Sequence, residues 1–117
     1  MSQKHSLLTL TILAAAALTA QRFVTTAGAV ATAAGNADGV AATDAAIGDL
    51  VPVDVAGTAV VTAGAAIAAG AYVQVGTDGK AITQASGGAA VGKALEAASA
   101  DGDPIEILLI PNAPTIA

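Results

Sequence analysis

The sequence predicts a small all-β domain, a barrel or sandwich with few or no helices that is built from two similar halves. Short strand-like segments recur along its 117 residues and are separated by Gly-rich turns, which is typical of this class. Helical signals are poor, because the Ala runs are short and are bordered by Gly or β-branched residues. A weak internal similarity divides the chain into two comparable parts.

The internal similarity is clearest around the only Phe and the only Tyr. Phe23 and Tyr72 lie 49 positions apart, and each is followed by Val. With the same shift Leu18 falls on Ile67, so each aromatic residue has a large aliphatic residue five positions before it. Because alanine identities carry little weight in so alanine-rich a chain, this aromatic register is the better evidence of a duplication.

A second correspondence lies nearer the end of each half. Residues 48–53, Gly-Asp-Leu-Val-Pro-Val, resemble residues 102–107, Gly-Asp-Pro-Ile-Glu-Ile, and in both Gly-Asp ends a loop of small residues and starts an alternating strand. These segments lie 54 positions apart, so the second half carries a short insertion. We predict an N-terminal arm, a duplicated β-domain and a C-terminal tail; these are residues 1–8, residues 9–110 (repeats of about 9–56 and 57–110) and residues 111–117.

The strands follow from alternation and turn residues. Residues 8–12, Leu-Thr-Leu-Thr-Ile, alternate apolar and polar side chains, as a half-buried strand does. Pro52 has no N–H, which places its strand at an edge or a bulge. Asp78-Gly79 predicts a tight hairpin turn. The further predicted strands are residues 22–26, 29–32, 51–55, 59–62, 72–75, 80–84, 90–95 and 104–110, with a turn at 35–39.

The N-terminus allows a second interpretation. A short basic start, an apolar run over residues 7–18 and small residues near Ala20 also match a secretory signal. The run is too short for a transmembrane helix. We favour a structural strand, since residues 12–20 correspond to residues 61–69 in the middle of the chain, where no targeting segment can lie. The alternative is a secreted bacterial surface protein cleaved near Gln21.

Composition bounds the function. The chain has 11% charged residues, a mean hydropathy of +0.72 and a formal net charge of −5, which argues against disorder. Its apolar residues are mostly Ala, so the core of this single domain is thin, and without Cys we expect stability to come from association. Nucleic acid is an unsuitable partner, because the cations are few and widely separated. They are Lys4, Arg22, Lys80 and Lys93.

Two motifs come close to binding sites. Residues 87–94, Gly-Gly-Ala-Ala-Val-Gly-Lys-Ala, fit a phosphate-binding loop until Ala94, where Ser or Thr is needed to hold Mg²⁺. The flanks also predict a loop and a strand rather than a strand and a helix, so we do not expect nucleotide binding.

The loop aspartates are the second such motif. Asp101 and Asp103, with Asp44 and Asp49 in the matching loop, offer oxygens of the kind Ca²⁺ prefers, but they lack the ligand spacing of an EF-hand. Solvated turn carboxylates are the favoured interpretation. His5 is the only His, so the usual His-based triad would rest on it, and we predict no catalytic, cofactor or metal site.

Over residues 9–110 the chain resembles the small capsid cement, or decoration, proteins of tailed bacteriophages. The resemblance rests on residues 65–73 (Ala-Ala-Ile-Ala-Ala-Gly-Ala-Tyr-Val), 78–81 (Asp-Gly-Lys-Ala), 91–98 (Val-Gly-Lys-Ala-Leu-Glu-Ala-Ala) and 100–109 (Ala-Asp-Gly-Asp-Pro-Ile-Glu-Ile-Leu-Leu). It implies a small β-rich fold, commonly trimeric, that binds outside the shell where major capsid subunits meet and performs no catalysis.

The expected function is therefore structural. The protein is predicted to bind the major capsid protein on the virion exterior as a homotrimer, without nucleic acid, membrane or cofactor. An acidic chain suits a position away from packaged DNA. We expect the arm, residues 1–8, or the tail, residues 111–117, to supply part of the capsid contact.

Overall fold

The computed structural model describes residues 6–25, 27–35, 37–85 and 88–109, and within them the regular structure is almost entirely strand. No α-helix occurs in these ranges, and the prediction of an all-β domain is confirmed. The elements are β1 (Ser6–Leu13), β2 (Phe23–Val24), β3 (Gly39–Ala41), β4 (Leu50–Thr62), β5 (Tyr72–Val75), the 3₁₀ turn η1 (Thr77–Gly79), β6 (Ala81–Thr83), β7 (Gly92–Ala94) and β8 (Pro104–Leu109).

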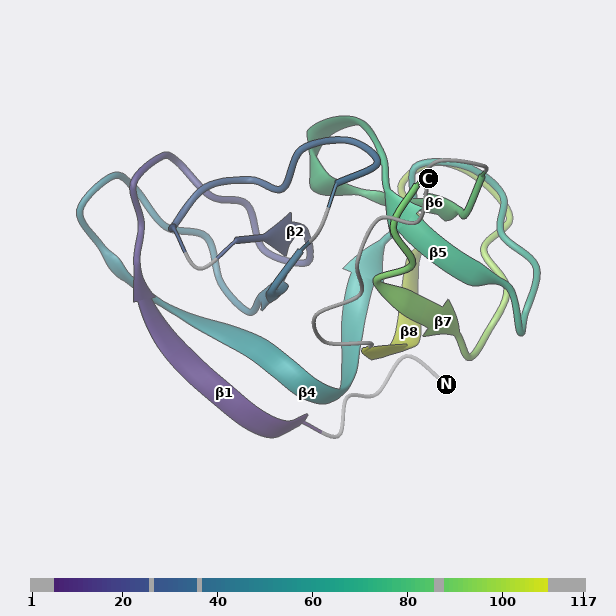
Figure 1. Ribbon diagram of the computed structural model, residues 1–117, viewed down its shortest axis with the longest axis horizontal. Helices are drawn as coiled ribbons and strands as arrows, with labels where there is room; N and C mark the ends of the chain where they lie inside the picture. Colours follow the sequence, from purple (N-terminus) through teal and green to yellow (C-terminus); the bar gives the residue numbers. More distant parts are fainter. Residues whose placement is uncertain (1–5, 26, 36, 86–87, 110–117) are drawn as a thin grey trace.

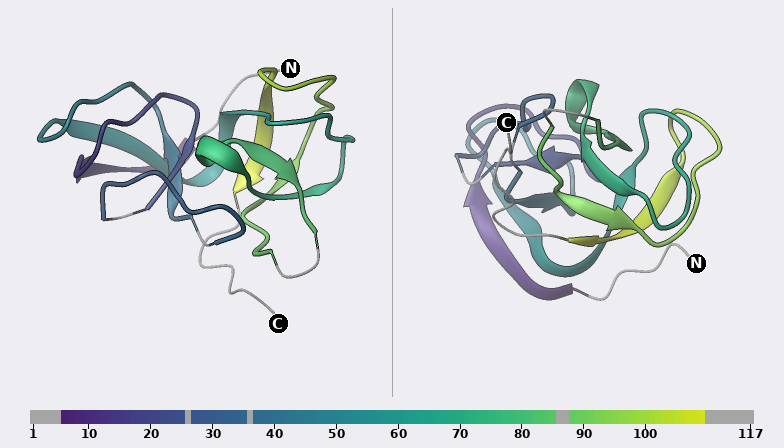
Figure 2. Two further views of the ribbon diagram at one scale, coloured as in Figure 1. Left: turned by 90° about the horizontal axis from the view of Figure 1, so that it is seen from above. Right: turned by 45° about the vertical axis from the view of Figure 1, so that its right-hand side comes forward.

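All strands belong to one antiparallel sheet whose centre is β4. The order is β2-β3-β4-β8-β7-β5-β6, and β1 pairs with β4 as well. Figure 1 shows β4 running from the first half of the chain, on the left, into the second half, on the right. The sheet curls strongly on itself, as the views of Figure 2 make clear, so its inner face encloses a core.

β4 differs from the prediction of two strands over residues 51–55 and 59–62. It is one strand of 13 residues. Gly57 lies in its middle with φ of 89°, a left-handed conformation that glycine adopts without steric cost. The strand therefore bends at Gly57 and continues, and the glycine that was expected to separate two strands joins them.

Pro52 lies in this central strand, so its assignment to an edge strand was wrong. β4 has a neighbour on each side here, because Val53 pairs with Leu10 of β1 and with Ala41 of β3. Proline is tolerated because the pairing of β3 with β4 ends at Val53. At Pro52 only the carbonyl is needed on this side, and it accepts a hydrogen bond from the Ala42 N–H at 2.9 Å.

The loop after β2 also departs from the prediction. Residues 29–32 form no strand and make only a single bridge, between Val30 and Val24. A tight turn precedes these residues, in which the Gly28 N–H donates to the Thr25 carbonyl at 3.0 Å. The chain then returns beside β2, where the Ala31 N–H donates to the Phe23 carbonyl at 3.0 Å. Residues 39–41, placed at and after a predicted turn, instead form β3.

The hairpin predicted at Asp78-Gly79 is confirmed. β5 and β6 pair antiparallel around η1. Asp78 and Gly79 have φ of 59° and 75°, the left-handed conformations that a tight hairpin turn requires. β7 and β8 lie within the strands predicted at residues 90–95 and 104–110, of which residue 110 is outside the described ranges.

The pairing of β1 with β4 recurs in the pairing of β4 with β8. Five successive residue pairs between β1 and β4 have equivalents between β4 and β8. The equivalents are found by adding 49 to the number of the β1 residue and 54 to the number of its β4 partner. They are Thr9–Asp54 on Thr58–Leu108, Leu10–Val53 on Ala59–Ile107, Thr11–Pro52 on Val60–Glu106, Ile12–Val51 on Val61–Ile105, and Leu13–Leu50 on Thr62–Pro104. The two predicted similar halves are present, and β4 belongs to both.

The core repeats in the same way. Each of the seven residues in the smaller hydrophobic cluster has its equivalent in the larger cluster. Ile12, Ala14, Leu18, Val24, Ala41, Val51 and Val53 correspond to Val61, Ala63, Ile67, Val73, Ala94, Ile105 and Ile107. Each half thus encloses its own small core.

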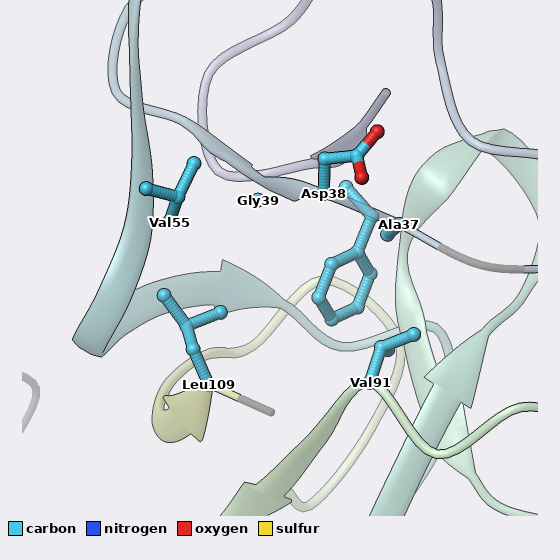
Figure 3. A pocket seen from close by; sticks show the side chains of 7 residues that line it. Ala37, Asp38, Gly39, Val55, Val91 and Leu109 are labelled. Carbon is cyan, nitrogen blue, oxygen red and sulfur yellow. The ribbon is translucent and has the colours of Figure 1, made fainter. Parts of the chain in front are cut away.

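The first half also contributes side chains to the core of the second, namely Phe23, Ala31, Ala37 and Val40. Phe23 is fully buried and, with Val91 and Leu109 of the second half, lines a void of about 10 Å³ (Figure 3). Such a void is at the lower limit for one water molecule, so the two halves pack closely. Backbone hydrogen bonds, such as Ala34 N–H to the Val75 carbonyl at 2.8 Å, also cross the junction.

The predicted arm and tail lie largely outside the described residues, which exclude 1–5 and 110–117. β1 begins at Ser6, so the last residues of the predicted arm are part of a strand. The domain boundaries otherwise stay a prediction.

The bend of β4 provides a test of this architecture. We expect Gly57→Ala to lower the free energy of unfolding by about 1–2 kcal/mol, because a residue with a Cβ is strained in the left-handed conformation. Ala34 already has φ of 63°, so Ala34→Gly is a matched control that should be neutral or stabilising. Urea unfolding of both variants measures the difference. An equal loss of stability in the two would contradict this role of Gly57.

Candidate interaction surface

Large apolar side chains are exposed on both halves of this acidic protein. On the first half they come from β1 and from the turn that leads into β4; on the second half they are fewer. They are Leu7, Leu8, Leu10, Leu13, Ile47 and Leu50 on the first half, and Tyr72, Leu95 and Leu108 on the second. Contiguous exposed apolar residues mark interaction sites more often than single ones do.

Three of these residues form a patch, which we call the leucine patch: Leu13, Leu50 and Ile47. Leu13 and Leu50 are directly opposite each other on β1 and β4, and they are 60% and 69% exposed. Ile47, in the turn just before β4, is 73% exposed. The patch lies where β1 ends and β4 begins, at the left of Figure 1.

The leucine patch has no counterpart in the second half. At the equivalent positions the second half carries a threonine, a proline and an aspartate, which are Thr62, Pro104 and Asp101. The duplicated framework therefore presents an apolar surface in one half and a largely polar surface in the other. Because the fold does not need leucine at these positions, the patch is a candidate for binding a partner.

β1 also offers a free edge. Within the described part of the chain it pairs only with β4. An unpaired strand edge is a template for pairing with another chain unless charge or proline blocks it, and β1 contains neither.

The near-match to a phosphate-binding loop has a structural explanation. Gly92 and Lys93 lie in β7, not at the start of a helix. At Gly88 a Cβ would overlap the side-chain amide of Gln74, whose Oε1 accepts a hydrogen bond from the Ala85 N–H at 2.8 Å. The glycine permits this close contact, and in the described part of the segment, residues 88–94, a strand lies where a phosphate-binding loop would start a helix.

Three of the four loop aspartates accept hydrogen bonds from backbone N–H groups, and two of these bonds lie within the aspartate's own turn. Asp49 accepts from the Ala46 N–H at 3.0 Å, and at the equivalent place Asp103 accepts from the Ala100 N–H at 3.2 Å. Asp44 accepts from the Ala20 N–H at 2.7 Å. These carboxylates hold the loops that start β4 and β8, so the favoured interpretation as turn carboxylates accounts for their contacts.

Asp101 is engaged differently, in an ion pair with Lys80 at 3.0 Å. The pair borders an open hollow of about 340 Å³ that is also lined by Asp78 and Ile82. Both charges are partly exposed, so the ion pair contributes little stability. Nothing in the lining converges on a point where a reacting group would sit.

The buried acids are separate from one another. Asp54 is 2% exposed and accepts a hydrogen bond from the Thr9 hydroxyl at 2.9 Å. Glu106 is also buried, on β8. Among the described residues no group of three or more His, Cys, Asp or Glu side chains lies close enough to hold a metal ion. His5 is outside the described ranges.

In the described ranges we find no helix with the length and hydropathy to cross a membrane.

Comparison with known proteins identifies a family. The model of a family described as "Phage cement protein" matches residues 1–109. No curated protein matches the chain. Among solved structures, the N base of the head fiber protein gp8.5 of bacteriophage phi29 superposes with a TM-score of 0.72 at 24% sequence identity, covering 88% of this chain and 93% of that one. At this identity the likeness concerns the fold.

The comparisons give no support to the alternative of a secreted surface protein. The packing explains why the N-terminal run is apolar, since Ile12, Ala14 and Leu18 belong to the core of the first half. Cleavage near Gln21 would remove β1 together with these core residues.

The role of the loop aspartates gives a second test. We expect Asp103→Ala to lower the free energy of unfolding by about 0.5–2 kcal/mol, because it leaves the Ser99 and Ala100 N–H groups without their acceptor. Calcium chloride should leave the melting temperature of the unsubstituted protein unchanged. Asp78→Asn, in a different turn, removes one charge and keeps a residue that tolerates the left-handed conformation of this position, so it serves as the control for lost charge. A calcium-dependent rise in melting temperature that Asp103→Ala abolishes would restore the calcium interpretation.

Proposed function

Because the chain belongs to the phage cement protein family, we propose that it binds the outer surface of a phage capsid and holds neighbouring major capsid protein subunits together. The family match over residues 1–109 carries this proposal and gives the protein a capsid-associated structural role. The outer surface and the major capsid protein are our further inference. A net charge of −5 supports it, since an acidic protein is repelled by the DNA packaged inside.

The leucine patch is the surface we assign to the capsid. Its three side chains are uncharged and largely exposed, and burying apolar area yields roughly 25 cal/mol per Å². A protein that binds across two shell subunits stabilises the assembled lattice by mass action, because it binds the assembled state and not the separated subunits. This role requires buried surface and a stable fold, and it requires neither catalysis nor a cofactor.

We further propose that the protein is a homotrimer. The core of each half is made mainly of Ala and Val, which bury little area per residue. Leu8 and Leu10 of β1, which lie outside the leucine patch, are exposed in the single chain, and association would cover them. A trimer would also present several leucine patches to the shell at once, which raises the overall affinity.

The leucine patch can be tested against its equivalent in the second half. We expect Leu50→Ser to weaken binding to capsids purified without this protein by roughly tenfold or more, the loss that follows from leaving one Leu unburied. Pro104→Ser changes the equivalent position to the same residue and should bind normally. Co-sedimentation with the capsids measures the affinity. Unchanged binding of Leu50→Ser would exclude the patch as the capsid contact.

The chain ends provide a separate test. We expect deletion of residues 1–5 or of residues 111–117 to reduce capsid occupancy without lowering the melting temperature, if these segments supply part of the contact. Occupancy is measured by quantitative cryo-electron microscopy of decorated capsids. Full occupancy after both deletions would leave the described surface as the whole contact.

A further inference from the structure

Part of the outer face of the first half is buried where the second half packs against it. On the neighbouring strands β2, β3 and β4, Phe23 pairs with Val40 and Val40 with Asp54, so the three side chains form a row across the sheet. We call it the first-half row. Its members are 0%, 1% and 2% exposed, although they point away from the first half's own core. Figure 1 shows β2 between β1 and the strands of the second half.

The equivalent row of the second half is uncovered. Tyr72 of β5 pairs with Lys93 of β7, and Lys93 pairs with Leu108 of β8, in the same arrangement. Tyr72 and Leu108, in this second-half row, are 51% and 43% exposed. The Lys93 ammonium lies 5.8 Å from the centroid of the Tyr72 ring. The duplication has therefore placed an aromatic and a leucine where nothing among the described residues packs over them.

The surface that covers the first-half row also has an exposed equivalent. Phe23 and Val40 share a core cluster with Ala59 of β4, which is fully buried. The residue equivalent to Ala59 is Leu10 of β1, which is 41% exposed, and Leu8 beside it is 50% exposed. These two, which we call the β1 leucines, lie at the end of the first half's core, and no described part of the chain closes that end.

We propose that the second-half row of one molecule packs against the β1 leucines of a second copy, repeating between molecules the contact that joins the two halves within one. Tyr72 would then take the place that Phe23 has in the single chain. Tyrosine suits such a position, because it buries a large ring while its hydroxyl stays in contact with water. Since the two contacting surfaces differ, the interface is heterologous, and such interfaces close into rings when the rotation allows.

A second copy explains both surfaces at once, which is why we prefer it to a capsid segment as the occupant. The two surfaces are at opposite ends of the duplicated unit, both expose large apolar side chains, and Lys93 is the one charged member. Their equivalents already fit each other inside the molecule. The inference rests on the homo-oligomer proposed above and is independent of capsid binding.

Cross-linking between single-cysteine variants tests this interface directly, because the natural chain has no Cys. Leu10→Cys and Tyr72→Cys are co-expressed with different tags and treated with a short bismaleimide. We expect covalent dimers that contain one chain of each kind and none from either variant alone. Ser99→Cys, in an exposed loop, replaces either partner as the control and should give no product.

The possible outcomes distinguish failure of the proposed interface from failure of the homo-oligomer. Self-linking of Leu10→Cys alone would indicate that β1 pairs with β1 across a two-fold axis, and it would overturn the head-to-tail interface. An oligomer by light scattering that gives no mixed product would also overturn it, while leaving the homo-oligomer itself intact. A monomer by light scattering would overturn the interface and the homo-oligomer together, and the capsid assay would still judge the capsid contact.

A second test avoids cysteine, because a cysteine substitution could itself weaken the interface. Leu10→Asp should convert the oligomer to monomer while retaining the circular dichroism spectrum of the fold, because Leu10 is exposed in the single chain. Leu95→Asp, at an exposed residue outside the second-half row, should leave the oligomer intact. Persistence of the oligomer in Leu10→Asp would contradict the assignment.

Discussion

The molecule depends on one strand that serves two halves at once. The first part of β4 completes the first half and its second part begins the next, so one strand joins the two halves into a single sheet. The bend at Gly57 lets one continuous strand change direction between them. Covalent continuity thereby fixes how the halves sit relative to each other, and the packing of Phe23 at the junction completes the fit.

Duplication leaves a molecule whose two ends are unequal. Within the chain, the outer face of one half meets the core of the next, which buries Phe23 and Ala59 completely. The equivalent surfaces at the two ends of the duplicated unit have no partner among the described residues, and Tyr72 and Leu10 are exposed. An alanine-rich protein with small cores therefore carries its largest exposed apolar groups at the places where association would stabilise it.

The halves have also diverged where the fold permits it. The Asp that accepts backbone N–H groups before β4 and β8 is present in both, because both loops need it. Leu50, by contrast, occupies a position that proline fills in the second half. Residues kept in both halves are thus needed for folding. Leu50 and its neighbours are not, and we assign them to binding a partner.

Much of this was accessible from the sequence, for reasons that are local. Alternation over residues 8–12 and the Asp-Gly turn depend on neighbouring residues, so both predictions were correct. Predictions failed where the outcome depends on distant partners: Gly57 bends a strand because β8 pairs beyond it, and residues 29–32 turn back instead of extending. The exposed surface was the hardest feature to predict, because the exposure of leucines in a strand depends on which side chains pack over them.

By itself, the sequence determined the all-β class, the two similar halves and the family, since these follow from residue types, spacing and the register of two lone aromatics. Only the tertiary structure decided which aromatic is buried. Phe23 and Tyr72 occupy the same place in their repeats, but the second half covers the first and nothing in the described chain covers the second. Burial depends on which side chains pack over a residue, and that is decided by the arrangement of the two halves rather than by the repeat itself.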